Sequence, residues 1–258
     1  MSKYLEYFDG AFDASVTEKI KLENKPYVAY SRTEGKVVYT VVPKEEPTST
    51  YQMVDLGLSV KWADRNVGAE TPQDNGLYFS WGNVDGHAVD ENGNVIDSYS
   101  FDKNTYSTTL GGKYTGSELD AEHDAAAVNM GSDWRMPTSV ETHELVQNTD
   151  QYYIDLSGNT VAKSELDSSK LRSICFVKKG EDFDYDNRTN FIEFPFAGCC
   201  DGSLLGYEGL DGYVWSSSVH EDSAEFARGL YFLSDGSLDG SGSGDLCYYG
   251  RSVRGVHA

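Results

Sequence analysis

Short apolar runs separated by turn residues dominate the chain from residue 51 onward. The clearest of these runs are LSVKWA (58–63), LYFSWG (77–82), SICFVKK (173–179), NFIEFPF (190–196) and GLYFL (229–233). They are rich in β-branched and aromatic residues, and Gly, Asn or Asp stands between them, which is typical of strands. The pattern therefore predicts mostly antiparallel strands and ordered loops over residues 51–258.

Two segments depart from this pattern and predict helices. SELDAEHDAAAVN (117–129) has the Ala and Glu content of a helix, with acidic residues in its first turn, where the helix dipole favours them. TSVETHELVQ (138–147) begins with Thr138 and Glu141 at the spacing of a capping box, directly after Pro137. Two helices beside mostly antiparallel strands predict an α+β fold.

The N-terminal residues predict a separate, small β-rich unit. KPYVAYSRTEGKVVYTVV (25–42) has two apolar runs joined at Thr33-Glu34-Gly35, which indicates a hairpin. We therefore expect a unit at 1–46, a linker at 47–50 and a larger domain at 51–258. A unit of this size buries little core, so we expect it to attach to something or to oligomerise.

The charge of the chain excludes one class of partner. Its 258 residues carry 42 acidic and 21 basic side chains, a formal net charge of -21. Such a field repels phosphate backbones, so we expect no nucleic-acid partner. No apolar run approaches the roughly 20 residues that span a bilayer, so we expect no membrane insertion. The first residues also lack the charged start and apolar centre of a secretory signal.

Several blocks in a fixed order resemble a known family. They are VDLGLSVKWADRNVGAETPQDNGLYFSWGN (54–83), DAAAVNMGSDWRMPTSVETHELV (124–146), FPFAGCCDGS (194–203), GYVWSSS (212–218) and YYGRSVRGV (248–256). The resemblance is to a domain of gut bacteria and phages with the C-type lectin-like fold. Its diversified members are the variable proteins of diversity-generating retroelements. The resemblance implies that fold for residues 51–258.

The most characteristic side chains of these blocks are expected to be scaffold. A Trp supplies a large buried surface, and an Arg can satisfy carbonyls or a carboxylate with its planar fork. We assign this role to Trp134, Arg135, Trp215, Arg251 and Arg254.

The segment between the last two blocks is expected to bind the ligand. In the variable proteins, mutagenesis rewrites exposed positions near the C-terminus while the fold is kept, which implies variable positions within residues 219–249. Strand alternation puts Leu230 and Phe232 on the packed face of GLYFL and Gly229, Tyr231 and Leu233 on the free face. The other expected binding positions are His220, Glu225, Phe226, Asp239, Ser241, Asp245 and Tyr248. SDGSLDGSGSGDLCYY (234–249) also has the composition of an antibody combining loop.

An enzyme is the first rival interpretation, because the lectin-like fold includes formylglycine-generating enzymes. Those enzymes need two nearby cysteines in their C-terminal part, where this chain has only Cys247. GxSxG, HExxH and P-loop motifs are absent from the sequence. We therefore expect no catalytic residues, and we expect all four cysteines to be reduced thiols.

Calcium is the one cofactor that the sequence raises. EDFDYDN (181–187) alternates Asp182, Asp184 and Asp186 in an oxygen-rich loop, but it lacks the spacing and distal glutamate of an EF-hand. A solvated acidic loop is the expected interpretation, with calcium as the alternative. We therefore expect no cofactor.

These observations lead to one expected function and two alternatives. The expected function is that of a phage receptor-binding protein at the tail tip, which binds a protein or glycan on the host cell surface. Display as a homotrimer would raise its avidity. The first alternative is an undiversified adhesin-like module on a bacterial cell surface, and the second is an oxidase similar to formylglycine-generating enzymes.

Overall fold

The computed structural model describes residues 27–33, 36–42, 51–109, 117–221, 223, 225–242 and 244–257. The chain divides into two compact units, Met1–Thr48 and Ser49–Ala258. In the first unit, β1 (Tyr27–Thr33) and β2 (Lys36–Val42) pair antiparallel with Thr33 opposite Lys36. The predicted hairpin is therefore confirmed. Its two turn residues and the predicted linker lie outside the described residues.

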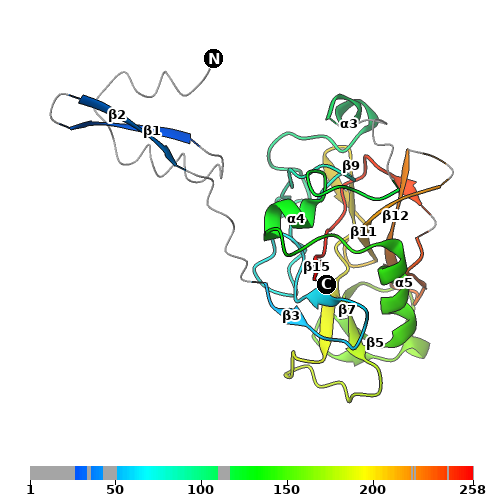
Figure 1. The fold of residues 1–258 in the computed structure, drawn as a ribbon. Coiled ribbons are helices and arrows are strands. Elements are labelled where there is room, and N and C mark those ends of the chain that lie inside the picture. The colour runs from blue at the N-terminus through cyan, green and yellow to red at the C-terminus, as the bar shows by residue number, and fades with distance from the viewer. Residues whose placement is uncertain are drawn as a thin grey trace. The chain divides into compact units, whose positions relative to one another are not determined.

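The described part of the second unit has an α+β fold with antiparallel sheets and three α-helices (Figure 1). The helices are α3 (Lys103–Thr109), α4 (Ala125–Met130) and α5 (Ser139–Asn148), followed by a 3-10 turn, η1 (Lys163–Glu165). The strands are β3 (Met53–Val54), β4 (Lys61–Ala63), β5 (Thr149–Asp155), β6 (Thr160–Val161), β7 (Leu171–Lys178), β8 (Phe191–Pro195), β9 (Cys199–Asp201), β10 (Leu204–Gly206), β11 (Asp211–Val219), β12 (Phe226–Leu233), β13 (Leu238–Asp239), β14 (Asp245–Leu246) and β15 (Val256–His257).

Two sheets organise the second unit. One has the order β6-β5-β7-β8, and the other has the order β11-β12-β13, with β14 also paired to β12. Helix α5 lies beside the second sheet (Figure 1). Near the C-terminus, β15 pairs with β4, with Val256 opposite Trp62. The two ends of the unit are therefore joined in one small sheet, β15-β4-β3.

Helix α5 confirms the predicted helix at 138–147. The Thr138 hydroxyl accepts a hydrogen bond from the Glu141 N–H, and the Glu141 carboxylate accepts one from the Thr138 N–H at 2.7 Å. Arg135 Nη1 donates to the same carboxylate at 2.8 Å. The capping box satisfies N–H groups that a helix otherwise leaves without a partner, so the local sequence is enough to start this helix.

The predicted helix at 117–129 is correct only in its second half. Asp124 is the N-cap, and its carboxylate accepts hydrogen bonds from the N–H groups of Ala126, Ala127 and Met136. Residues before it are not helical, because the Leu119 N–H donates to Ser217 and the Val219 N–H donates to Ser117. Tertiary pairing with β11 therefore outweighed the helix propensity of this segment.

The hydrophobic pattern gave one further wrong prediction and missed one helix. The run at 77–82 forms no strand, and Tyr78 and Phe79 instead make single bridges to His87 and Arg251. Helix α3 was not predicted, because its sequence KNTYSTT has no apolar stripe. Asp102 stabilises its start by accepting from the Asn104 and Thr105 N–H groups at 2.9 Å each.

The β11–β12 hairpin separates the two largest hydrophobic clusters. The first contains Val214, Leu230 and Phe232 together with Trp62. The second contains Trp215 from the next position of β11. Because neighbouring residues of a strand point to opposite sides, the same two strands complete both clusters. The position of this hairpin is therefore fixed by packing on both sides.

We expect the Glu141→Gln variant to lose less stability in acid than the unchanged protein. Burial acts to raise the pKa of Glu141, but its bonds to Arg135 and Thr138 outweigh it, so the pKa lies below the ordinary 4.5. The Glu141 carboxylate therefore binds a proton more readily in the unfolded chain than in the folded one. Its contribution to the free energy of unfolding is present above pH 4.5 and is lost as pH falls through the folded pKa. Urea unfolding from about pH 7 to about pH 3 measures the difference. The prediction is wrong if the free energy of unfolding falls equally with pH in Glu141→Gln and in the unchanged chain. Glu165→Gln is the control, and its free energy of unfolding should fall with pH as that of the unchanged chain does.

Candidate ligand-binding surface

The β11–β13 sheet presents one face that is only partly covered. Its core-facing residues are Val214, Leu230 and Phe232, all fully buried. On the other side, the register places Asp211 opposite Leu233, Tyr213 opposite Tyr231, and Tyr231 opposite Asp239. We call these residues the outer face: Asp211, Tyr213, Tyr231, Leu233 and Asp239. Each is half-buried, so each has side-chain surface available to a ligand.

The expectation that Gly229 is exposed was wrong. It lies on the same side of β12 as Tyr231, opposite Trp215, but it is buried. A Cβ on Gly229 would lie 2.6 Å from the Val214 carbonyl oxygen, and one on Gly242 would lie 2.5 Å from the Gly229 N and O atoms. The segment around Gly242 therefore covers this position, which only a residue without a side chain permits.

We expect the Gly229→Val variant to be destabilised by about 3 kcal/mol, because a branched side chain must displace the backbone of Val214 in β11. Thermal unfolding with circular dichroism measures the loss. Leu233→Val is the matched control on the same strand, and we expect it to change the free energy of unfolding by less than about 1 kcal/mol. A Gly229→Val protein as stable as the unchanged chain would show that the covering loop does not pack there.

A buried arginine lies against the aromatic rings on this side of the sheet. The Arg251 side chain is fully buried, and its guanidinium carbon lies 4.5 Å from the ring centroid of Tyr213, 4.4 Å from that of Trp215 and 5.3 Å from that of Tyr231. Its Nη2 forms an ion pair with Asp245. Nε and Nη1 have no hydrogen-bond partner in the described part of the chain, so contact with the rings stabilises that side of the cation. Arg251 is thus scaffold that orients both tyrosines.

The loop after β13 is held at both ends by side chains that the sequence interpretation missed. Arg228 Nη1 donates to the carbonyls of Ser241 and Gly242 at 3.0 and 2.9 Å, and its Nη2 pairs with Glu221. The Thr142 hydroxyl of α5 donates to the Gly240 carbonyl at 2.6 Å. The signal for Arg228 was a single arginine inside the largely apolar run FARGLYFL. Ser241 in this loop is exposed.

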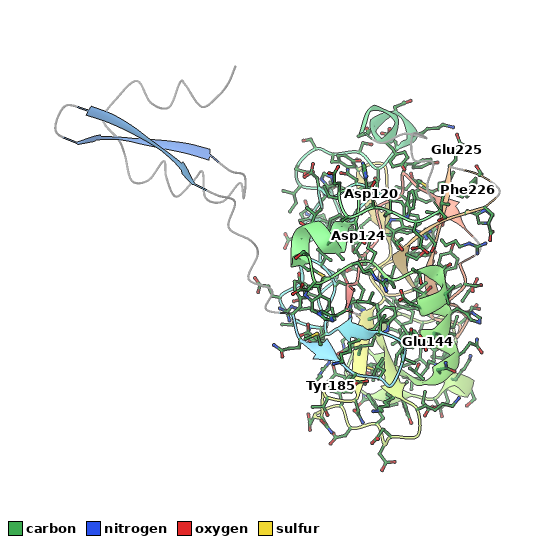
Figure 2. All side chains as sticks on the ribbon, viewed as in Figure 1. Asp120, Asp124, Glu144, Tyr185, Glu225 and Phe226 are labelled. Carbon is green, nitrogen blue, oxygen red and sulfur yellow. The ribbon has the colours of Figure 1, made fainter. Side chains whose placement is uncertain are left out.

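The remaining predicted binding residues fall into two places. Glu225 is exposed and pairs with Lys103, Phe226 is half-buried, and the His220 ring lies 6.4 Å from the Phe226 ring. Figure 2 shows Glu225 and Phe226 together at the end of the domain that also carries α3. Tyr248 is half-buried against Tyr249, with ring centroids 4.9 Å apart. His220, Glu225 and Phe226 thus lie at the start of β12, whereas the outer face includes its end at Leu233.

The other expected scaffold residues have packing or bonding roles. Trp134 is buried, with its ring 6.3 Å from Tyr51 and 5.9 Å from His257. Arg135 is half-buried and braces the start of α5 through Glu141. Arg254 is fully buried and donates to two backbone carbonyls.

The four cysteines all lie in the described residues, and none forms a disulfide. Burial raises the pKa of Cys247 to about 12 and that of Cys199 to about 11. Burial likewise raises the pKa of Cys200 to about 12. At neutral pH these groups are therefore thiols, which are poor nucleophiles and poor metal ligands.

The aspartates of the acidic loop are not gathered into one group of ligands. No group of three His, Cys, Asp or Glu side chains in the described residues is arranged to hold an ion. Asp182, Asp184 and Asp186 are each exposed, and the Asp184 carboxylate accepts a hydrogen bond from the Asp186 N–H.

No helix in the described residues is long and apolar enough to cross a bilayer.

Comparison with known proteins leaves the family open. No family model, curated protein or solved structure matches the chain.

Proposed function

We propose that residues 51–258 form a non-enzymatic receptor-binding domain that uses the outer face to bind a protein or glycan on a host cell surface. The single observation that carries the proposal is the pair of half-buried tyrosines, Tyr213 and Tyr231, whose rings lie against the Arg251 guanidinium. Tyrosine gives a wide contact area at little entropic cost, and the neighbouring Asp and Ser groups supply hydrogen bonds.

The finer proposal is a C-type lectin-like variable protein at a phage tail tip. The ordered blocks from 54–83 to 248–256 support it, and so does the α+β arrangement of antiparallel sheets and helices. Diversified positions would be those with accessible side chains. They are His220, Glu225, Phe226, Tyr231, Leu233, Asp239, Ser241, Asp245 and Tyr248.

The N-terminal hairpin supports an attachment or oligomerisation role for the first unit. Its described strands form a two-stranded sheet, and such a hairpin is at best marginally stable by itself in water. A homotrimer or a virion surface would supply the missing partner. Several copies would then act together on one cell, which raises the apparent affinity without a new contact.

Two alternatives keep the fold and change the role. An undiversified bacterial surface adhesin would use the same outer face. An oxidase similar to formylglycine-generating enzymes is disfavoured, because the raised pKa of Cys247 and of Cys199 keeps both sulfurs protonated near neutral pH.

The nucleotide sequence around the gene separates diversification from the adhesin. We expect a near-copy of the segment encoding residues 219–249 downstream, differing at adenines and followed by a reverse transcriptase. Sequencing of the locus across a population should then find substitutions at Tyr231 and Leu233 but none at Gly229. A locus without the repeat would favour the adhesin.

The binding function is tested with the full chain, labelled with a fluorophore, on a panel of gut bacterial isolates. We expect at least one isolate to bind, and Tyr231→Ala/Leu233→Ser to weaken that binding about tenfold or more. The control Ile96→Ser/Leu156→Ser changes two apolar residues, 62% and 66% exposed, that lie outside the outer face. Binding to no isolate, or equal binding by both double variants, would overturn the proposal.

A further inference from the structure

Carboxylates surround the tyrosines of the outer face. Asp211 and Asp239 belong to the face, where the Tyr213 hydroxyl donates to Asp211 at 2.8 Å and Asp239 lies opposite Tyr231. Asp245 pairs with Arg251, whose guanidinium contacts both tyrosine rings, and Asp201 in β9 is near enough to Cys199 for its charge to act on that thiol. Burial is the largest cause of the raised pKa of the nearby Cys199 thiol. The charge of Arg251 acts to lower that pKa, and the charges of Asp245, Asp211 and Asp201 act to raise it. The surface therefore concentrates negative charge around two aromatic rings.

Only one of these carboxylates is neutralised. Asp245 pairs with Arg251, whose guanidinium contacts the tyrosine rings of the face. In the described part of the chain, Asp201, Asp211 and Asp239 form no ion pair with a Lys or Arg. Asp239 accepts only from the Ser241 N–H and hydroxyl, at 2.8 and 2.7 Å. The surface thus keeps an excess of negative charge that a partner can compensate.

The aromatic rings of the same surface already hold a cation. The guanidinium of Arg251 lies within 5.3 Å of three ring centroids, those of Tyr213, Trp215 and Tyr231. Ring faces next to carboxylates are a favourable environment for Lys or Arg side chains. A bound metal ion does not fit as well, because the described residues contain no group of three ligands placed to hold one.

We propose that the partner of the outer face is a cationic protein segment, one that presents Lys or Arg side chains to Tyr213, Tyr231 and the aspartates around them. The inference rests on the proposed function, because it names the chemistry of the ligand for that same face. The net charge of -21 adds a long-range field of the same sign, which speeds association with a basic surface. Glycans that carry carboxylates or phosphates are repelled by the same field.

The first experiment measures binding of an octalysine peptide and an octaglutamate peptide to the full chain by fluorescence anisotropy. We expect only octalysine to bind, with an affinity that falls as salt is raised. Asp211→Asn/Asp239→Asn should weaken it about fivefold. The control Asp182→Asn/Asp186→Asn makes the same change of charge in the loop between β7 and β8, and we expect it to weaken binding less than about twofold.

A second pair of variants tests the aromatic contribution. Tyr231→Leu removes the ring and keeps apolar contact, so we expect octalysine binding to weaken about threefold. Tyr231→Phe keeps the ring face and should bind as the unchanged chain does. Circular dichroism of each variant shows that the fold is retained.

The outcomes separate this inference from the proposed function. If cells are bound through Tyr231 and Leu233 but Asp211→Asn/Asp239→Asn leaves that binding unchanged, the partner is not cationic and only the inference is lost. Equal weakening of octalysine binding by the control pair, or binding of octaglutamate, would also overturn it. If Tyr231→Ala/Leu233→Ser leaves cell binding intact, both the face and the inference are wrong.

Discussion

The Arg254→Met variant is expected to be destabilised by about 3–5 kcal/mol. Arg254 is 0% exposed, and it donates to the Ala63 carbonyl at 2.8 Å, the Glu193 carbonyl at 2.8 Å and the Asn66 side-chain oxygen at 3.0 Å. Burial lowers its pKa to about 9, which leaves the guanidinium charged at neutral pH. Methionine fills part of the volume of the arginine side chain but donates no hydrogen bond. The two backbone carbonyls and the Asn66 oxygen then stay buried without a donor, which lowers the free energy of unfolding.

Urea unfolding at neutral pH measures the loss of free energy. Arg254→Lys retains the charge without the planar fork, so it should be intermediate between Arg254→Met and the unchanged protein. Lys103→Met removes a surface ion-pair partner of Glu225 and should leave the unfolding midpoint unchanged. If Arg254→Met and Lys103→Met have the same free energy of unfolding, the hydrogen bonds of Arg254 to β4 and β8 do not stabilise the domain.

The Trp215→Ala variant is expected to be destabilised by about 4 kcal/mol and to bind no ligand through the outer face. Trp215 is 0% exposed, its indole N–H donates to the Phe79 carbonyl at 2.8 Å, and its ring lies 4.4 Å from the Arg251 guanidinium carbon. Its loss leaves a cavity beside a buried cation. Arg251 then loses one of its three aromatic contacts, and its position against Tyr213 and Tyr231 is less well fixed.

Thermal unfolding and near-ultraviolet circular dichroism test this second prediction together. Trp215→Phe keeps a ring next to Arg251 and should lose only about 1–2 kcal/mol. Val140→Ala, at a position 75% exposed on α5, is the control for a simple truncation. A Trp215→Ala protein with unchanged stability and ligand binding would show that Arg251 alone positions the tyrosines.

The elements that could be predicted are those with local stabilising contacts. Helix α5 was predicted because Thr138 and Glu141 cap each other within one turn. The β1–β2 hairpin was predicted because its turn and its alternation are adjacent in the sequence. The run at 77–82 failed, since Tyr78 and Phe79 find their partners at His87 and Arg251 rather than in a regular ladder.

The candidate site could be predicted in part for the same reason. Alternation along β12 correctly put Leu230 and Phe232 in the core and left Tyr231 and Leu233 half-buried. It failed at Gly229, because a loop from later in the chain covers that position. Tyr213 was missed because it stands inside a block interpreted as scaffold, and only the register of β11 on β12 places it beside Tyr231.

The α+β class, the capped helix α5 and the alternation of buried and accessible side chains along β12 can be derived from the sequence, because they depend on contacts within a few residues. The contact of Arg251 with Tyr213 and Tyr231, and the cover of Gly229 by the loop that Arg228 and Thr142 hold, became visible only in the folded chain. Burial and pairing at these positions depend on which distant segments pack together. No pattern within one segment contains that information.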